Sequence, residues 1–269
     1  MLSKLLSTLT ATVCAALLMV TCTASTQLLP VVSVAAVPEP PAPPPVSLPY
    51  DFSQPVPQSE PVGTEYFSDA AFVGDSRTDG FYLFSGVGGG DNLTATGLSV
   101  FTLSTKQAIK TEYGTLTVLD ALERKSYGKV YLSLGVNELG YHNNDAFYAA
   151  YCAAIDAIRT RQPDAVIYVQ TLIPLNEGRI KASGGASYLT NEKLIVYNEI
   201  IRRVAREKQV PLLDLYSVFV VDGQLPEDFS RDGVHLTAAY YPIQLDYFKT
   251  HTVTPSQLNT TIQPVEGLI

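Results

Sequence analysis

The sequence predicts an α/β fold built on a doubly wound parallel sheet, and two observations support this class. Short, continuous apolar runs recur along the chain, and segments with helical spacing of apolar residues separate them. Continuous runs are typical of parallel strands that are covered on both faces. Alternating strands and helices favour right-handed crossovers, which place helices on both sides of one sheet.

The apolar runs predicted to be strands are 70–73, 129–134, 165–169 and 211–215. Three helices are predicted between the later strands. The first spans 116–127 and ends at Gly128, because glycine favours helix C-termini. The second begins after Asn143 or Asn144 and the third after Thr190, since these side chains cap helix N-termini.

The first part of the chain is predicted to lie outside the folded domain. Residues 1–24 carry Lys4 and then an apolar stretch broken by threonines, which is typical of a secretory signal peptide. Two other readings stay open, a lipid carried by Cys22 and an uncleaved N-terminal anchor, although ~20 apolar residues are normally needed to span a membrane. Residues 25–62 hold most of the prolines and are predicted to be a disordered linker. All three readings place the protein outside the cytoplasm, either secreted or attached to the cell surface.

The folded domain is predicted over residues 63–255, with a C-terminal tail over 256–269. Only Cys152 falls within the domain, so no internal disulfide is expected, and no metal-ligand spacing is present. We therefore predict neither a cofactor nor a metal. The formal net charge of −8 and the lack of a basic stripe argue against a nucleic-acid partner.

A serine stands where a strand is predicted to give way to a helix. The apolar run 70–73 leads into Gly74-Asp75-Ser76, and the segment that follows has helical spacing. In open parallel sheets ligands bind outside the carboxyl ends of the strands, and a helix N-terminus carries partial positive charge. Ser76 is therefore a candidate nucleophile, and an ordinary helix N-cap is the alternative.

An aspartate and a histidine stand three residues apart near the end of the predicted domain. Asp232 and His235 follow a turn-rich stretch, and this spacing places them on the same side of a turn or helix start. A serine hydroxyl needs a base to become a good nucleophile, and histidine is the usual choice near neutral pH. Asp232 can accept a hydrogen bond from the other ring nitrogen and fix the tautomer. A capped surface loop is the alternative.

Four short blocks in this order resemble the SGNH hydrolases, also called GDSL esterases. The blocks are Gly74-Asp75-Ser76, Gly97, Gly135-Val136-Asn137-Glu138 and Asp232-x-x-His235. The likeness spans about residues 66–250, and Glu138 departs from the family's Gly-x-Asn-Asp block at its last position. The resemblance implies a three-layer α/β/α fold with a mostly parallel five-stranded sheet, the flavodoxin-like SGNH fold. The Gly-x-Ser-x-Gly elbow of the α/β-hydrolases is absent, since Thr78 takes its last position.

The resemblance also implies roles for individual residues. Ser76, Asp232 and His235 would be catalytic. The main-chain N–H groups of Ser76 and Gly97 and the side-chain amide of Asn137 would form the oxyanion hole, where donors meet the charge of a tetrahedral intermediate. Gly97 suits this role because a backbone donor must approach the substrate closely. Asn137 taken alone would be interpreted as a turn residue.

The predicted function is removal of an acyl group, most simply O-acetyl, from a cell-wall or extracellular polysaccharide. The predicted partners are a small acyl ester or an acylated polysaccharide, with a membrane involved only through the N-terminal anchor or a lipid on Cys22. An acyltransferase with the same site and a non-catalytic wall-binding module are the alternatives. Tryptophan is absent, so sugar stacking would fall to tyrosines: Tyr82, Tyr141, Tyr240 or Tyr241. Arg77 and Arg231 flank the blocks and are candidates either to meet an anionic substrate or to be structural.

Overall fold

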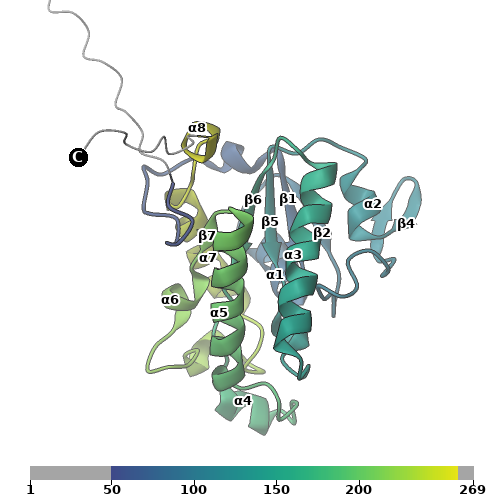
Figure 1. Ribbon diagram of the computed structural model, residues 1–269. Helices are drawn as coiled ribbons and strands as arrows, with labels where there is room; N and C mark the ends of the chain where they lie inside the picture. Colours follow the sequence, from purple (N-terminus) through teal and green to yellow (C-terminus); the bar gives the residue numbers. More distant parts are fainter. Residues whose placement is uncertain (1–49, 260–269) are drawn as a thin grey trace, which may run out of the picture. The chain divides into compact units, whose positions relative to one another are not determined.

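The computed structural model describes residues 50–259 (Figure 1). The predicted leader over 1–24, Cys22 and the first part of the predicted linker lie outside the described residues. Within residues 50–259, no helix is both long enough and apolar enough to cross a membrane.

The centre of the fold is a sheet of five strands in the order β2-β1-β5-β6-β7, and every pair is parallel. Its strands are β1 (Ala70–Gly74), β2 (Asp91–Thr94), β5 (Lys129–Ser133), β6 (Val166–Gln170) and β7 (Leu212–Leu213). All residues of β1 and β6 are buried, as expected for parallel strands covered on both faces. The predicted fold class and its five-stranded parallel sheet are confirmed.

Helices cover both faces of the sheet and complete the three layers (Figure 1). One face packs against α2 (Val118–Leu122), α3 (Asn144–Arg161) and α5 (Asn191–Lys208). The other packs against α1 (Ser76–Phe84), α6 (Leu215–Phe219) and α7 (Tyr241–Thr250). The remaining elements are short: η1 (Thr64–Phe67), β3 (Ile109–Thr111), β4 (Gly114–Leu116), η2 (Val136–Glu138), α4 (Glu177–Ala182), η3 (Glu227–Phe229), η4 (Ala238–Tyr240) and α8 (Pro255–Asn259).

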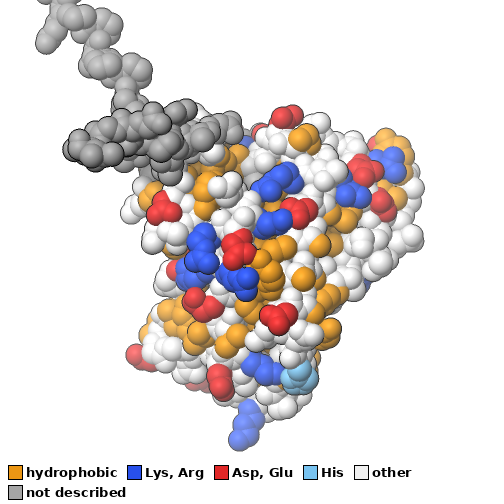
Figure 2. Space-filling model, viewed as in Figure 1, with side chains coloured by type: hydrophobic (Ala, Val, Ile, Leu, Met, Phe, Trp, Pro, Cys, Tyr) orange, Lys and Arg blue, Asp and Glu red, His pale blue; other side chains and the backbone are white. Residues whose placement is uncertain are grey.

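The two long helices begin where their capping residues predict. The Asn143 side chain accepts from the Ala146 N–H at 2.9 Å, and the Thr190 hydroxyl accepts from the Lys193 N–H at 3.4 Å. The helix predicted over 116–127 is shorter at both ends. It begins later because Leu116 belongs to β4 and Thr117 caps the helix, and it ends at Leu122, so the prediction that Gly128 closes it is wrong. Figure 2 shows the face covered by α3 and α5, where acidic and basic side chains are interspersed.

Residues 50–62 belong to the folded domain, so the linker boundary predicted at residue 62 is wrong for this segment. Tyr50 and Val56 are buried, and the Val56 N–H donates to the Leu212 carbonyl of edge strand β7 at 2.8 Å. The Val62 N–H donates to the Lys249 carbonyl at the end of α7. Although the segment is rich in proline, four of its N–H groups, those of Tyr50, Val56, Ser59 and Val62, donate to carbonyls of the rest of the fold. We call residues 50–62 the strap.

The predicted C-terminal tail also begins too early. Residues 255–259 form α8, and Leu258 packs against the same apolar cluster as α7. The Gln257 carbonyl accepts from the Tyr50 N–H at 3.1 Å, so the strap and α8 meet at one edge of the domain.

Candidate active site

Ser76 lies at the point where the winding of the sheet reverses. Strand β1 has β2 on one side and β5 on the other, and Ser76 is the first residue of the helix that follows β1. Such a switch point is the usual ligand site of an open α/β sheet. Gly74 allows the helix to start close to the sheet, because a Cβ there would lie 2.0 Å from Thr78 Oγ1 and 2.7 Å from the Ser133 carbonyl oxygen.

The structure brings the three predicted catalytic side chains into one hydrogen-bonded line. Ser76 Oγ lies 2.8 Å from His235 Nε2, although the two residues are 159 positions apart. His235 Nδ1 lies 2.7 Å from Asp232 Oδ2. With Nδ1 protonated, the ring donates to the carboxylate and leaves Nε2 free to accept from the serine hydroxyl. This is the arrangement that a nucleophile, its base and an orienting acid require.

The Asp232 carboxylate is held by its own loop. Its Oδ1 accepts from the main-chain N–H groups of Val234 and His235 at 2.8 and 2.9 Å and from the Ser230 hydroxyl at 3.2 Å. Partial burial by itself raises the pKa of Asp232, but these N–H donors and the His235 ring outweigh it and lower the pKa to about 2. Asp232 therefore stays ionised at neutral pH and can stabilise a protonated histidine ring.

Two of the three predicted oxyanion donors have no partner within the described part of the chain. These are the main-chain N–H groups of Ser76 and Gly97. Gly97 has a φ of +66°, a conformation that favours glycine, and the residue is exposed. The Asn137 amide nitrogen donates to the Leu98 carbonyl at 3.0 Å and to Asp75 Oδ2 at 3.2 Å. An oxyanion would take one of these two amide hydrogens.

The family model described as GDSL-like lipase/acylhydrolase matches residues 72–243, which is more than half of the chain and includes every residue of this site. The chain belongs to the GDSL-like lipase/acylhydrolase family. It is an ester hydrolase of the SGNH type, and the predicted family resemblance is confirmed.

Solved structures show the same fold as this GDSL hydrolase. A Streptococcus pneumonia protein described provisionally as a platelet activating factor is 22% identical, with a TM-score of 0.55, and the match covers 67% of this chain and 82% of that one. A protein of Parabacteroides merdae, provisionally assigned as a GDSL-like lipase, has 15% identity and a TM-score of 0.52, with 72% and 97% covered. A GDSL-like lipase of Bacteroides thetaiotaomicron has 15% identity and a TM-score of 0.50, with 71% and 89% covered. A comparison with curated protein sequences found no match.

Two buried side chains of the GDSL hydrolase, Glu138 and Arg77, link the loops that carry the site residues. The sequence pattern did not reveal these contacts. Glu138 is 3% exposed, and its Oε1 accepts from the Val100 N–H at 2.7 Å. This bond ties the turn that carries Asn137 to the loop that carries Gly97. Burial raises the pKa of Glu138 to about 7, and the Val100 N–H opposes that rise only in part.

Of the two roles predicted for Arg77, the structure supports the structural one. Its side chain is buried, and its guanidinium donates to the carbonyls of Val234 at 2.8 Å and Ile173 at 2.9 Å. Arg77 therefore links the start of α1 to the loop that carries His235. Main-chain carbonyls are present at every residue, so no residue pattern could have indicated these two bonds.

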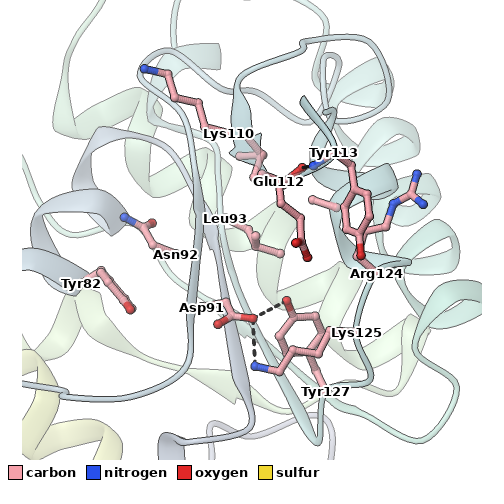
Figure 3. A pocket seen from close by; sticks show the side chains of 13 residues that line it. Tyr82, Asp91, Asn92, Leu93, Lys110, Glu112, Tyr113, Arg124, Lys125 and Tyr127 are labelled. Carbon is pink, nitrogen blue, oxygen red and sulfur yellow. Dashed lines mark hydrogen bonds and ion pairs between the residues drawn. The ribbon is translucent and has the colours of Figure 1, made fainter. Parts of the chain in front are cut away.

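The GDSL hydrolase presents its site on an open surface. The side chains of His235 and Asp232 keep 43% and 47% of their surface exposed, and Asn137 is exposed as well. A separate hollow of about 480 Å³ lies at the edge of β2, beside α2 and the β3–β4 hairpin (Figure 3). Its carboxylate Asp91 accepts from Lys125 and Tyr127. The sugar-stacking candidate Tyr82 lines this hollow, but none of the predicted catalytic or oxyanion residues does. Among residues 50–259, no group of three or more His, Cys, Asp or Glu could hold a metal ion.

Proposed function

We propose that this GDSL hydrolase is a serine esterase in which Ser76 is the nucleophile, His235 the base and Asp232 the orienting acid. The observation that carries the proposal is the continuous line Ser76–His235–Asp232, with both contacts at 2.7–2.8 Å. In the first half of the reaction Ser76 Oγ attacks the ester carbonyl carbon, and its proton passes to His235 Nε2.

The tetrahedral intermediate then collapses to an acyl-enzyme. Its oxyanion accepts from the Ser76 and Gly97 N–H groups and from the Asn137 amide, which gives up its bond to Asp75. As the C–O bond to the alcohol breaks, His235 returns its proton to the leaving oxygen. Water repeats the sequence on the acyl-enzyme and releases the acid. Because the site is open to solvent, hydrolysis is favoured over transfer to a second alcohol.

The proposed substrate is a short acyl ester, most simply O-acetyl, on a cell-wall or extracellular polysaccharide. An open site admits a polymer, whereas a long acyl chain would need an enclosed apolar channel to bury it. The N-terminal leader and the proline-rich segment predicted from the sequence support a place outside the cytoplasm, either secreted or attached to the cell surface.

The test is the hydrolysis of 4-nitrophenyl acetate, followed by acetate release from O-acetylated polysaccharides. Ser76→Ala should fold normally and hydrolyse the aryl ester near the background rate, and a serine-reactive phosphonate should label Ser76 in the wild type alone. Turnover by Ser76→Ala at the wild-type rate, or labelling elsewhere in the chain, would refute the assignment.

A further inference from the structure

Two exposed aromatic side chains pair beside the predicted oxyanion hole. Phe101 is 39% exposed and Tyr141 is 46% exposed, and their ring centroids lie 4.8 Å apart with the planes inclined at 53°. Most aromatic rings of this domain are buried in its two apolar clusters or packed against them. A pair left at the surface, in mutual contact, is suited to pack against a ligand.

The pair is carried by the same two segments that carry the oxyanion donors. Phe101 follows Gly97 in one loop, and Tyr141 follows Asn137 in the other. Asn137 joins the two segments by donating to the Leu98 carbonyl at 3.0 Å. The aromatic pair therefore lies within a few residues of both predicted donors.

Glu138 anchors the backbone next to both rings. Its carboxylate accepts from the Val100 N–H at 2.7 Å, next to Phe101, and its main-chain carbonyl accepts from the Tyr141 N–H at 2.7 Å. The same carbonyl accepts from the buried Tyr197 hydroxyl at 2.8 Å, and that hydroxyl also reaches the Tyr141 carbonyl at 3.1 Å. The backbone beneath both rings is thus anchored without help from the rings themselves.

The surroundings of Tyr141 are mixed, because Val196 and Tyr197 lie beside the polar side chains. A hollow of about 180 Å³ adjoins Tyr141, and its lining includes His142, Asn144 and Lys193. An acyl chain that extended into it would remove these groups from water without replacing their hydrogen bonds, which is costly. A sugar ring has an apolar face for the aromatic pair and hydroxyls for the polar groups, so this mixed lining fits a sugar.

The other tyrosines named as sugar-stacking candidates are otherwise engaged. Tyr241 is buried, and Tyr82 donates to the Gly90 carbonyl in the connection that leads into β2. Tyr240 stacks on Phe229 at 3.8 Å and donates to Asp228. Tyr141 is the candidate that is both exposed and next to a predicted oxyanion donor.

We propose that Phe101 and Tyr141 form a sugar-binding subsite, against which a pyranose ring of the acylated polysaccharide lies while its acyl group reaches Ser76. The subsite rests on the proposed function, because it names the substrate class of the same site. The ligand chemistry is that of a pyranose ring in an acylated polysaccharide, which plant xylan and bacterial wall glycan share.

Binding can be tested apart from catalysis in the full chain with Ser76→Ala as background. The probes are O-acetylated xylan oligosaccharides in one arm and O-acetylated glycan strands from bacterial cell wall in the other, with affinity measured by titration calorimetry. Adding Tyr141→Ala or Phe101→Ala should weaken binding about tenfold, the size expected for one well-packed aromatic contact. Tyr141→Phe keeps the ring and should bind like the background protein.

The matched control is Tyr113→Ala. Tyr113 is 63% exposed and lines the separate hollow at the edge of β2 (Figure 3). It should leave polysaccharide affinity unchanged. Unfolding curves of all variants verify that the fold is intact.

Several outcomes would overturn the subsite. These are no binding of either probe, equal binding with and without Tyr141→Ala, or a loss on Tyr113→Ala as large as that on Tyr141→Ala. The acyl chain can be tested with Tyr141→Ala in a protein that keeps Ser76. If this variant loses tenfold more activity on 4-nitrophenyl octanoate than on 4-nitrophenyl acetate, the pair binds the acyl chain instead. Failure of the esterase proposal is a different result, since it appears as absent aryl-ester hydrolysis in the wild type.

Discussion

Replacing Glu138 by glutamine should make the domain more stable at alkaline pH and leave most of its activity. Glu138 is 3% exposed, and its Oε2 has no hydrogen-bond partner within residues 50–259. Burial disfavours the charged form and raises the pKa of this carboxyl from 4.5 to about 7. Glutamine keeps the shape of the side chain and an acceptor for the Val100 N–H, but it cannot ionise.

The sign and size of the effect follow from the two pKa values. Below pH 4.5 the folded and unfolded chains both hold the Glu138 proton, so its contribution to folding is fully present. As the pH rises toward 7 the unfolded chain loses the proton first, and the free energy of unfolding falls. The gap between 4.5 and about 7 corresponds to about 3 kcal/mol, at about 1.4 kcal/mol for each pH unit.

The assay is urea unfolding of the wild type and Glu138→Gln at a series of pH values between about 4 and 8.5. The stability of the variant relative to the wild type should rise by about 3 kcal/mol across this range. Glu199→Gln, at a side chain that is 72% exposed, is the control and should show no such trend. If the difference in unfolding free energy between Glu138→Gln and the wild type does not change with pH, the pKa of Glu138 is not raised by burial. Activity as low as that of Ser76→Ala would show instead that Glu138 takes part in the chemistry.

Two further predictions concern the oxyanion hole and the strap. Asn137→Ala should lower kcat on an aryl ester by about 10²–10³-fold with little change in KM, because the lost donor acts on the transition state. Steady-state and stopped-flow kinetics measure this, and a normal kcat would show that Asn137 is not an oxyanion donor. A chain that begins at Tyr50 should unfold like the full chain, whereas one that begins at Gly63 should lose roughly 3 kcal/mol or more, since Tyr50 and Val56 lose their buried sites. Equal urea midpoints for the two truncated chains would mean that the strap contributes nothing to stability.

The parts of the fold that the sequence predicted depend on local chemistry. Asn143 and Thr190 mark helix starts because a capping side chain bonds within its own turn. The strap was missed because its bonds run to Leu212 and Lys249, far along the chain, and proline content alone reads as a linker. The β3–β4 hairpin was missed because its strands are three residues each and mostly exposed, so they show no apolar period.

The site was predictable for a related reason. Ser76, Asn137 and His235 each stand in a short block whose residue types carry the chemistry, and the topology of a parallel sheet brings strand ends together. The buried contacts of Arg77 and Glu138 were not predictable, because both involve main-chain partners whose place only the folded loops determine.

The strap begins at the end of the domain that lies away from the proposed active site. Tyr50 meets Gln257 at α8, whereas Asn176, which caps α4, donates its N–H to the Gly233 carbonyl in the loop of the proposed catalytic histidine. Figure 1 shows α8 and α4 at opposite ends of the domain. A tether that reaches the domain through Tyr50 therefore attaches at the end remote from Ser76. A molecule attached to a bead or a sensor chip directly at Tyr50 would therefore keep its proposed reactive face away from the point of attachment, where a bulky polymer can approach it.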